Sequence, residues 1–291
     1  MSSFPSGWLK GRWGWLVIWT TAFVVCALVA LICHLAELHP WSDVSADRIA
    51  WYHREECENV DTKGFFLQLL NFWSNFAYLA TGLMILCLNE KPLGRFVGIV
   101  FLFLAVGSGW FHGTLSEFGQ TVDIAGVYVA LLAIAFYGFV EMVPLEHTDP
   151  KVWILMGGAV VLGVVGAFVR GNVHFFDSDY FTPMLVFIIL VYMVSSAFRY
   201  PGPNQANLLL PGLGALVLGL AALVFKFTDG DDNALADNGK VYAKCLYGPE
   251  SPIQGHAIWH SLSALMFLCM FEFFRSLKGR SQSVFPWRTT A

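Results

Sequence analysis

The sequence predicts an all-α integral membrane protein, a seven-helix bundle with one additional N-terminal transmembrane helix. Of its 291 residues, 56% are hydrophobic and 13% are charged, whereas a typical soluble domain has about 25% charged residues. The apolar residues form stretches of about 18–25 residues, which as helices cross a hydrocarbon core of about 30 Å. The stretches do not alternate as barrel strands do, so helices are the expected spanning elements.

Eight predicted spans are separated by connectors that carry helix breakers, such as "NEKPLG" at 89–94 and "YPGPNQAN" at 200–207. The spans cover approximately residues 14–35, 64–88, 94–113, 119–141, 152–170, 181–199, 207–227 and 255–275. Two connectors, 36–63 and 228–254, are long and polar. We therefore expect an N-terminal extension with a transmembrane helix at 1–50, a core at 51–280 and a cytoplasmic tail at 281–291.

The first span is open to two interpretations. Lys10 and Arg12 precede its apolar run, as in a secretory signal peptide. The run is longer than a usual signal-peptide core, and no clear cleavage site of small residues follows it. We interpret the segment as a retained helix, with a cleaved signal peptide as the alternative.

Charge predicts the orientation of the spans. With eight spans, loops 36–63, 114–118, 171–180 and 228–254 share one side, and both termini lie on the other. Acidic residues are concentrated in the loops of the first side, whereas lysine and arginine are concentrated on the side of the membrane that holds both termini. The positive-inside rule therefore places both termini in the cytoplasm and the long polar loops on the periplasmic or lumenal side.

Titratable side chains sit near the ends of three predicted spans. His112 ends one span, His256 and His260 begin the last, and Asp123 lies one turn inside a third. All four belong to the side of the long loops. His256 and His260 are spaced i, i+4 on one helix face, as are Ser108 and His112. Ionisable residues inside spans are candidates for function. The remaining histidines lack such pairing and are expected to be interface or loop residues.

This arrangement suits a catalytic zinc ion. Two histidines at i, i+4 and a third from another helix supply three ligands and leave one position for water. Zinc lowers the pKa of that water to about 7 and polarises a carbonyl oxygen. Asp123 is then the candidate general base, and Ser108 a candidate donor to a developing oxyanion. The alternative is that the histidines are packed or hydrated side chains without a metal.

A stripe of polar residues marks the second predicted span. Asn71, Ser74 and Asn75 lie at i, i+3 and i+4, so they share one face of an apolar helix. Hydrogen bonding between helices accounts for such a stripe without catalysis, and we expect that structural role.

The motifs resemble the alkaline ceramidase family of seven-transmembrane, zinc-dependent intramembrane hydrolases. The resemblance is carried by "CEN" at 57–59, "NFWSN" at 71–75, "GSGWFHGTLSEFGQTVD" at 107–123 and "QGHAIWH" at 254–260, in family order. It implies that His112, His256 and His260 bind zinc, Asp123 contacts the zinc water, and Ser108 lies near the substrate carbonyl. It also implies hydrolysis of ceramide to a sphingoid base and a fatty acid.

Two further features follow from the resemblance. Family members carry a disulfide between loops, and Cys57 and Cys245 lie in the two long loops, where an oxidising compartment would let them pair; two unrelated thiols are the alternative. Eukaryotic members also bind calcium near their first helix. Oxygen ligands of that type are present in Glu55, Glu56, Glu58, Asn59 and Asp61. However, Gln68 stands where the family has a glutamate, so a solvated acidic loop is equally compatible.

The predicted function is hydrolysis of ceramide, or a related lipid amide, by a metal-activated water, with a membrane lipid as substrate. One alternative keeps the metal and changes the bond to another lipid amide or an ester. Another is a receptor-like or structural membrane protein, because the progestin and adiponectin receptor group shares the seven-helix zinc architecture. A net charge of −4 and the absence of a long basic run argue against a nucleic-acid partner.

Overall fold

The computed structural model describes residues 14–38, 40–41, 44–143, 145–199, 205–228 and 251–277. Within these ranges the chain is helical and contains no β-strand, as predicted. The elements are α1 (Gly14–Leu35), α2 (Ala46–Glu56), α3 (Leu69–Ser74), α4 (Phe76–Leu88), α5 (Pro92–Thr114), α6 (Glu117–Met142), α7 (Pro150–Val169), the 3-10 turn η1 (His174–Phe176), α8 (Ser178–Arg199), α9 (Gln205–Thr228) and α10 (Gly255–Leu277).

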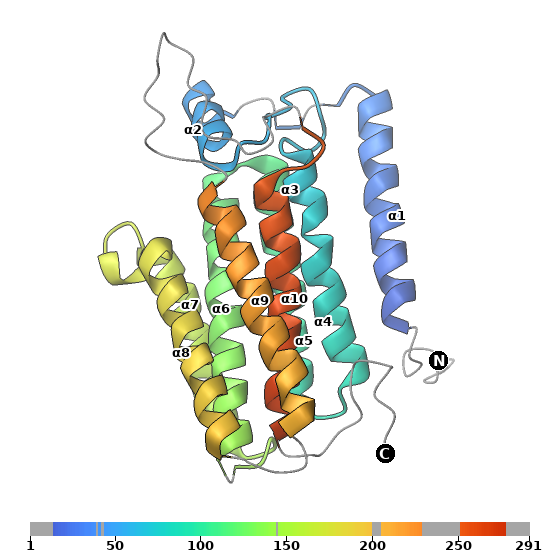
Figure 1. The fold of residues 1–291 in the computed structure, drawn as a ribbon. Helices are drawn as coiled ribbons and strands as arrows, with labels where there is room; N and C mark the ends of the chain where they lie inside the picture. The colour runs from blue at the N-terminus through green and yellow to red at the C-terminus, as the bar shows by residue number, and fades with distance from the viewer. Residues whose placement is uncertain are drawn as a thin grey trace.

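Eight segments of the described chain are long and apolar enough to cross a membrane, with α3 and α4 together forming one of them. They match the eight predicted spans, so the protein is a multi-pass integral membrane protein. Successive spans run in opposite directions (Figure 1). The C-terminal end of α5 and the N-terminal end of α10 therefore lie at the same end of the bundle, which we call the histidine end.

The N-terminal helix α1 stands at the edge of the bundle (Figure 1) and buries none of its residues. Its contact with α3 and α4 is aromatic. Phe23 packs against Trp73 and Phe76, with ring centroids 4.7 and 5.2 Å apart. Trp19 Nε1 donates a hydrogen bond of 2.9 Å to the carbonyl oxygen of Phe76. A helix with apolar residues on all sides and so little burial is suited to face lipid.

The predicted span at 64–88 is not one continuous helix. Residues 64–68 precede the helical part, which is then interrupted at Asn75, between α3 and α4. There the amide of Asn75 bonds to the carbonyl of Phe72, three residues back, at 3.2 Å. The side chains of Ser74 and Asn75 instead donate to the carbonyl of Asn71, at 2.7 and 2.8 Å. Polar side chains that bond to nearby carbonyls compete with the regular helical ladder.

Helix α2 lies within a connector that was predicted as a long polar loop. The side chain of Ser45 accepts a hydrogen bond from the amide of Arg48 at 3.3 Å, which caps its first turn. From α2 the Arg48 side chain donates Nε to the carbonyl of Leu115 and lies 3.7 Å from the carboxylate of Glu117. Leu115 is fully buried and ends α5 with φ of 49°. Arg48 thus ties α2 to the turn between α5 and α6.

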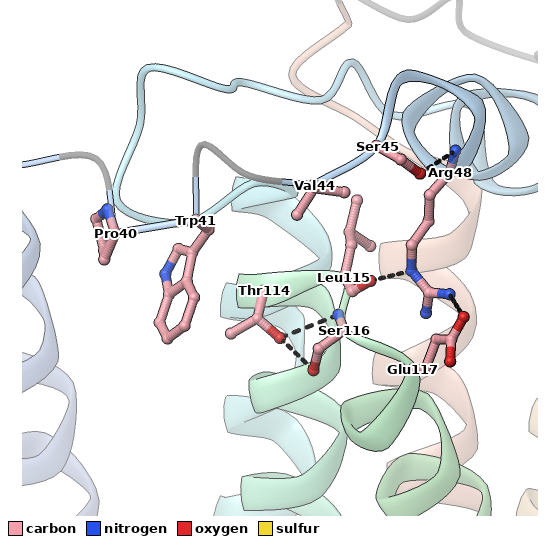
Figure 2. A pocket seen from close by; sticks show the side chains of 9 residues that line it. All are labelled: Pro40, Trp41, Val44, Ser45, Arg48, Thr114, Leu115, Ser116 and Glu117. Atoms are coloured by element: carbon pink, nitrogen blue, oxygen red, sulfur yellow. Dashed lines mark hydrogen bonds and ion pairs between the residues drawn. The ribbon is translucent and has the colours of Figure 1, made fainter.

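A surface pocket of about 300 Å³ lies at this junction (Figure 2). It is open to one side and lined by Pro40, Trp41, Val44, Ser45, Arg48, Thr114, Leu115, Ser116 and Glu117. The pocket borders the C-terminal end of α5, two residues beyond His112.

Close packing of α4 on α5 depends on two facing glycines. A Cβ atom built on Gly98 would lie 2.9 Å from the carbonyl oxygen of Gly82, and one on Gly82 would lie 2.9 Å from the carbonyl of Gly98. Small residues at helix contacts allow backbones to approach in membranes, where van der Waals packing drives association. This contact holds α5, which carries His112, against α4.

Buried charges gather at the opposite end of the bundle, and each has a partner. The carboxylate of Glu141 on α6 lies 2.7 Å from Nε2 of His147 and 3.4 Å from Nζ of Lys91. On α10, Glu272 pairs with Arg275 at 2.9 Å. His147, expected to be a loop or interface residue, lies in the α6–α7 loop and also contacts the carboxylate of Glu141. Pairing is what allows such charges inside an apolar bundle.

Candidate metal centre

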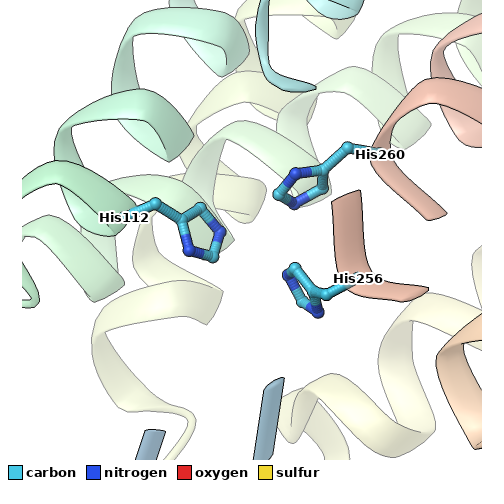
Figure 3. Close-up of side chains that lie close together, drawn as sticks. All are labelled: His112, His256 and His260. Atoms are coloured by element: carbon cyan, nitrogen blue, oxygen red, sulfur yellow. The ribbon is translucent and has the colours of Figure 1, made fainter. Parts of the chain in front are cut away.

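Three imidazoles converge at the histidine end of the bundle (Figure 3). His112 comes from the last turn of α5, and His256 and His260 come from the first two turns of α10. One ring nitrogen from each lies within 4.8 Å of those of the other two. The ring centroids are 4.6–5.1 Å apart. His112 and His260 are almost completely buried, and His256 is half-buried. The spacing of these residues in the sequence predicted this meeting.

Hydrogen bonds fix the orientation of two of these rings. Nδ1 of His112 lies 2.7 Å from Oε1 of Gln68, and a carbonyl oxygen can only accept, so Nδ1 carries the proton. Nδ1 of His260 lies 2.7 Å from Oγ of Ser74, whose own hydrogen is donated to the carbonyl of Asn71. His260 is therefore also protonated on Nδ1. In both rings Nε2 is then the nitrogen that would bind a metal.

The residues present fit a first-row transition metal better than calcium or magnesium. Imidazole nitrogens suit zinc and its neighbours, whereas calcium and magnesium prefer oxygen ligands. Three nitrogens that bind one zinc ion at about 2.0–2.1 Å lie about 3.3 Å apart. The ligand nitrogens of the three histidines lie within 4.8 Å of one another, so small rotations of the rings would bring them to this spacing. Histidine, cysteine and acidic side chains are the usual metal ligands in proteins. Among the described residues, these three histidines lie close enough together to hold a metal ion.

Asp123 and Ser108 do not belong to this group. Ser108 is buried on α5 one turn before His112, on the same helix face. Asp123 lies in the second turn of α6 and is half-buried. Tyr78 on α4 also lies beside the group, with its ring centroid 5.7 Å from that of His260. The roles of Asp123 and Ser108 at this centre therefore stay predictions.

Of the residues considered for calcium, the structure describes the side chains of Glu58, Asn59 and Asp61. Both carboxylate oxygens of Glu58 accept backbone amides at the start of α3, from Leu70 at 2.6 Å and Asn71 at 2.8 Å. Asp61 is exposed and accepts the amide of Lys63 at 3.0 Å. Asn59 is also exposed. The side chains of Glu55 and Glu56 lie outside the described part of the structure, so the calcium site stays a prediction.

Cysteine placement agrees with the sequence where it can be examined. Cys26, Cys33, Cys87 and Cys269 are free thiols, as expected. Cys57 ends α2 and is fully buried. Cys245 lies outside the described residues, so its pairing with Cys57 also stays a prediction.

The fold and this centre define a multi-pass membrane protein with a candidate three-histidine metal site near one membrane surface. The model of the ceramidase family matches residues 57–290, which is most of the chain. The chain therefore belongs to the ceramidase family, as the resemblance of its motifs implied. Membership of this family makes the protein a hydrolase that acts on the amide bond of a lipid. No curated protein matches this chain.

Sequence reasoning missed the second layer of the site. Gln68 was considered only as a departure from a calcium ligand, yet it bonds to His112. Ser74 was expected to bond between helices, and its partner is the candidate metal ligand His260. Tyr78, whose hydroxyl lies 2.6 Å from Oγ of Ser263, was not considered. Their spacing from the histidines along the chain gives no signal, because these contacts join segments up to 186 residues apart.

Proposed function

We propose that this protein is a zinc-dependent amidase that hydrolyses ceramide, or a related lipid amide, within the membrane. The observation that carries the proposal is the convergence of His112, His256 and His260 with ligand atoms within 4.8 Å. Zinc, when bound there, would act as a Lewis acid that polarises the amide carbonyl and acidifies water. Membership of the ceramidase family supports the substrate class.

The chain's own residues would move protons around the scissile amide. The carboxylate of Asp123 is suited to accept a proton from the attacking water and return it to the leaving nitrogen, because a carboxylate can alternate between base and acid. The hydroxyl of Ser108 is suited to donate to the carbonyl oxygen as negative charge develops on it. Burial of Ser108, His112 and His260 would strengthen these interactions by excluding bulk water.

The depth of the site suits a lipid amide. His260 is the sixth residue of α10, so it lies about 7.5 Å along the helix from its start, at a rise of about 1.5 Å per residue. In a ceramide the amide links the sphingoid base to one fatty acyl chain, beside the hydroxyl groups of the polar end. Substrate that diffuses sideways from the bilayer would therefore present its amide at the level of the histidines, with its chains directed toward the membrane interior.

The orientation of the site is part of the proposal. The excess of basic residues near the termini supports placing both termini in the cytoplasm and the zinc site toward the periplasm or lumen. In that compartment a Cys57–Cys245 disulfide would persist. The free state of Cys26, Cys33, Cys87 and Cys269 is compatible with this pairing.

The decisive experiment measures metal content and ceramide hydrolysis on the same purified protein. His260→Ala is expected to lose zinc and activity together, because two imidazoles leave the ion under-coordinated. Ceramides of several chain lengths and one lipid ester should be compared as substrates. Preference for an ester would change the bond assigned to the enzyme. Zinc bound by the wild type without hydrolysis of any lipid amide or ester would favour the receptor-like or structural alternative.

Calcium is tested separately on the zinc-loaded protein. If Glu55, Glu56, Glu58, Asn59 and Asp61 form a site, calcium should bind saturably and raise the thermal unfolding temperature, and Glu58→Gln should weaken that effect. An unfolding temperature that does not respond to calcium would leave the segment as a solvated acidic loop.

A further inference from the structure

We propose that Gln68 and Ser74 are positioning residues that hold His112 and His260 in the Nδ1–H tautomer and thereby set the affinity of the site for zinc. The identity of the metal rests on the proposed function. Both residues come from one stretch of eight residues, 68–75, although the imidazoles that they hold belong to two different helices. One short segment would thus orient two of the three ligands.

Gln68 is fixed against the end of α5 by its backbone as well as its side chain. Its amide donates to the carbonyl of His112 at 3.0 Å, and the amide of Leu67 donates to the carbonyl of Gly113 at 3.1 Å. The side chain of Gln68 is completely buried. Its Oε1 then accepts Nδ1–H of His112 at 2.7 Å. The glutamine consequently has little freedom to turn away from the ring.

Ser74 depends on the interruption between α3 and α4. Because the amide of Asn75 bonds to Phe72, the carbonyl of Asn71 is left for side-chain donors. The hydroxyl of Ser74 donates to it at 2.7 Å. A hydroxyl has one hydrogen, so toward His260 the Ser74 oxygen can only accept. The irregular turn at Asn75 therefore determines the tautomer of an imidazole on α10.

Glu58 anchors the segment that carries both residues. Its two carboxylate oxygens accept the amides of Leu70 and Asn71, which are among the unsatisfied donors at the start of α3. A negative charge at this end of a helix is favourable. Glu58 is buried, so the bonds are shielded from water. The two amides that Glu58 holds lie between Gln68 and Ser74 along the chain, so these bonds would keep both residues in register with the rings.

The physical expectation is a graded loss of zinc affinity. Hydrogen bonds to the second nitrogen of a ligating imidazole fix its tautomer and raise its basicity, and their loss typically weakens metal binding by about 10–100-fold. Ser74→Ala and Gln68→Leu remove the acceptors and are each expected to weaken zinc within that range. Gln68→Glu keeps an acceptor and adds charge, so it should bind zinc at least as tightly as the wild type.

The test is the zinc dissociation constant of the full chain in detergent, measured by competition with a chelator of known affinity. Ser261→Ala is the matched control, because the side chain of this neighbour of His260 bonds only to the backbone carbonyl of Ala257 among the described residues. The zinc affinity of this variant should stay within about two-fold of the wild type. Histidine nitrogen NMR spectra should show Nδ1–H for both rings in the wild type and a changed tautomer distribution in the variants.

Thermal unfolding of the metal-free variants separates loss of positioning from loss of fold. If Gln68→Leu does not fold, the zinc affinity of Ser74→Ala and the NMR spectra still test whether the imidazoles are positioned in this way. Zinc affinities of Ser74→Ala and Gln68→Leu within about two-fold of the wild type would overturn this inference and leave the proposed function intact. A wild-type protein that holds no zinc would overturn both.

Discussion

Oγ of Ser74 on α3 lies 2.7 Å from Nδ1 of His260 on α10, although 186 residues separate them in the chain. The contact joins the polar stripe of one span to the candidate metal ligands of another. It explains why an apolar bundle tolerates polar side chains at this depth, since each of the two groups supplies the other's hydrogen bond.

Asp123→Asn should retain zinc and lose turnover. The amide has the volume of the carboxylate but does not accept a proton readily, so kcat is expected to fall by about 10²–10⁴. Metal analysis and ceramide hydrolysis on the same preparation provide the measurement. Full activity in this variant would contradict the role of Asp123 as the proton-transfer group.

Ser108→Ala should also retain zinc, with a smaller loss of activity. Removal of one donor to a developing oxyanion costs about 10²–10³ in kcat. The loss should fall on kcat rather than KM, because the bond strengthens as charge develops on the carbonyl oxygen. A change confined to KM would assign Ser108 to ground-state binding of the lipid instead.

Gly98→Ala should destabilise the bundle. The added Cβ would lie 2.8 Å from the amide nitrogen of Leu86 and 2.9 Å from the carbonyl of Gly82, and backbone atoms cannot move aside singly. Overpacking of this kind costs about 1–3 kcal/mol. Gly157→Ala on α7 is the matched control, since its Cβ meets nothing within 4 Å. Thermal unfolding in detergent should show a lower midpoint for Gly98→Ala alone.

A Cys57–Cys245 disulfide predicts four reactive thiols among the six cysteines of denatured, unreduced protein. After reduction the count should rise to all six. In the chain-entropy model, closing a loop of about 190 residues stabilises the folded state by about 4–5 kcal/mol. Six reactive thiols before reduction would rule out the pairing.

Topology can be tested at two exposed loop positions. In a background that lacks other reactive cysteines, Asn172→Cys should react with a membrane-impermeant reagent from the periplasmic or lumenal side. Glu146→Cys, in the loop at the other end of the bundle, should react only once the cytoplasmic face is opened. The reverse pattern would invert the assigned orientation and would make the disulfide difficult to reconcile with the compartment.

The sequence by itself determined the class of the fold. Apolar runs of spanning length leave the chain few options, because every backbone polar group inside a bilayer must bond internally and a helix achieves this locally. The same argument extends to His112, His256 and His260. Once the spans alternate in direction, residues at corresponding ends must share a depth, so the meeting of the three histidines could be predicted from their positions alone.

Tertiary structure decided which side chains support the site. The bonds from Gln68 to His112 and from Ser74 to His260 depend on rotation of the helices about their axes and on the interruption at Asn75. Apolar content does not encode those quantities, because a span that faces lipid on one side and other helices on the other is hydrophobic all round. Helix α2 was missed because a short polar helix in a connector lacks the apolar run by which the spans were recognised. Length and hydrophobicity act locally and can be read from the chain, whereas the pairing of distant polar groups exists only after the helices have packed.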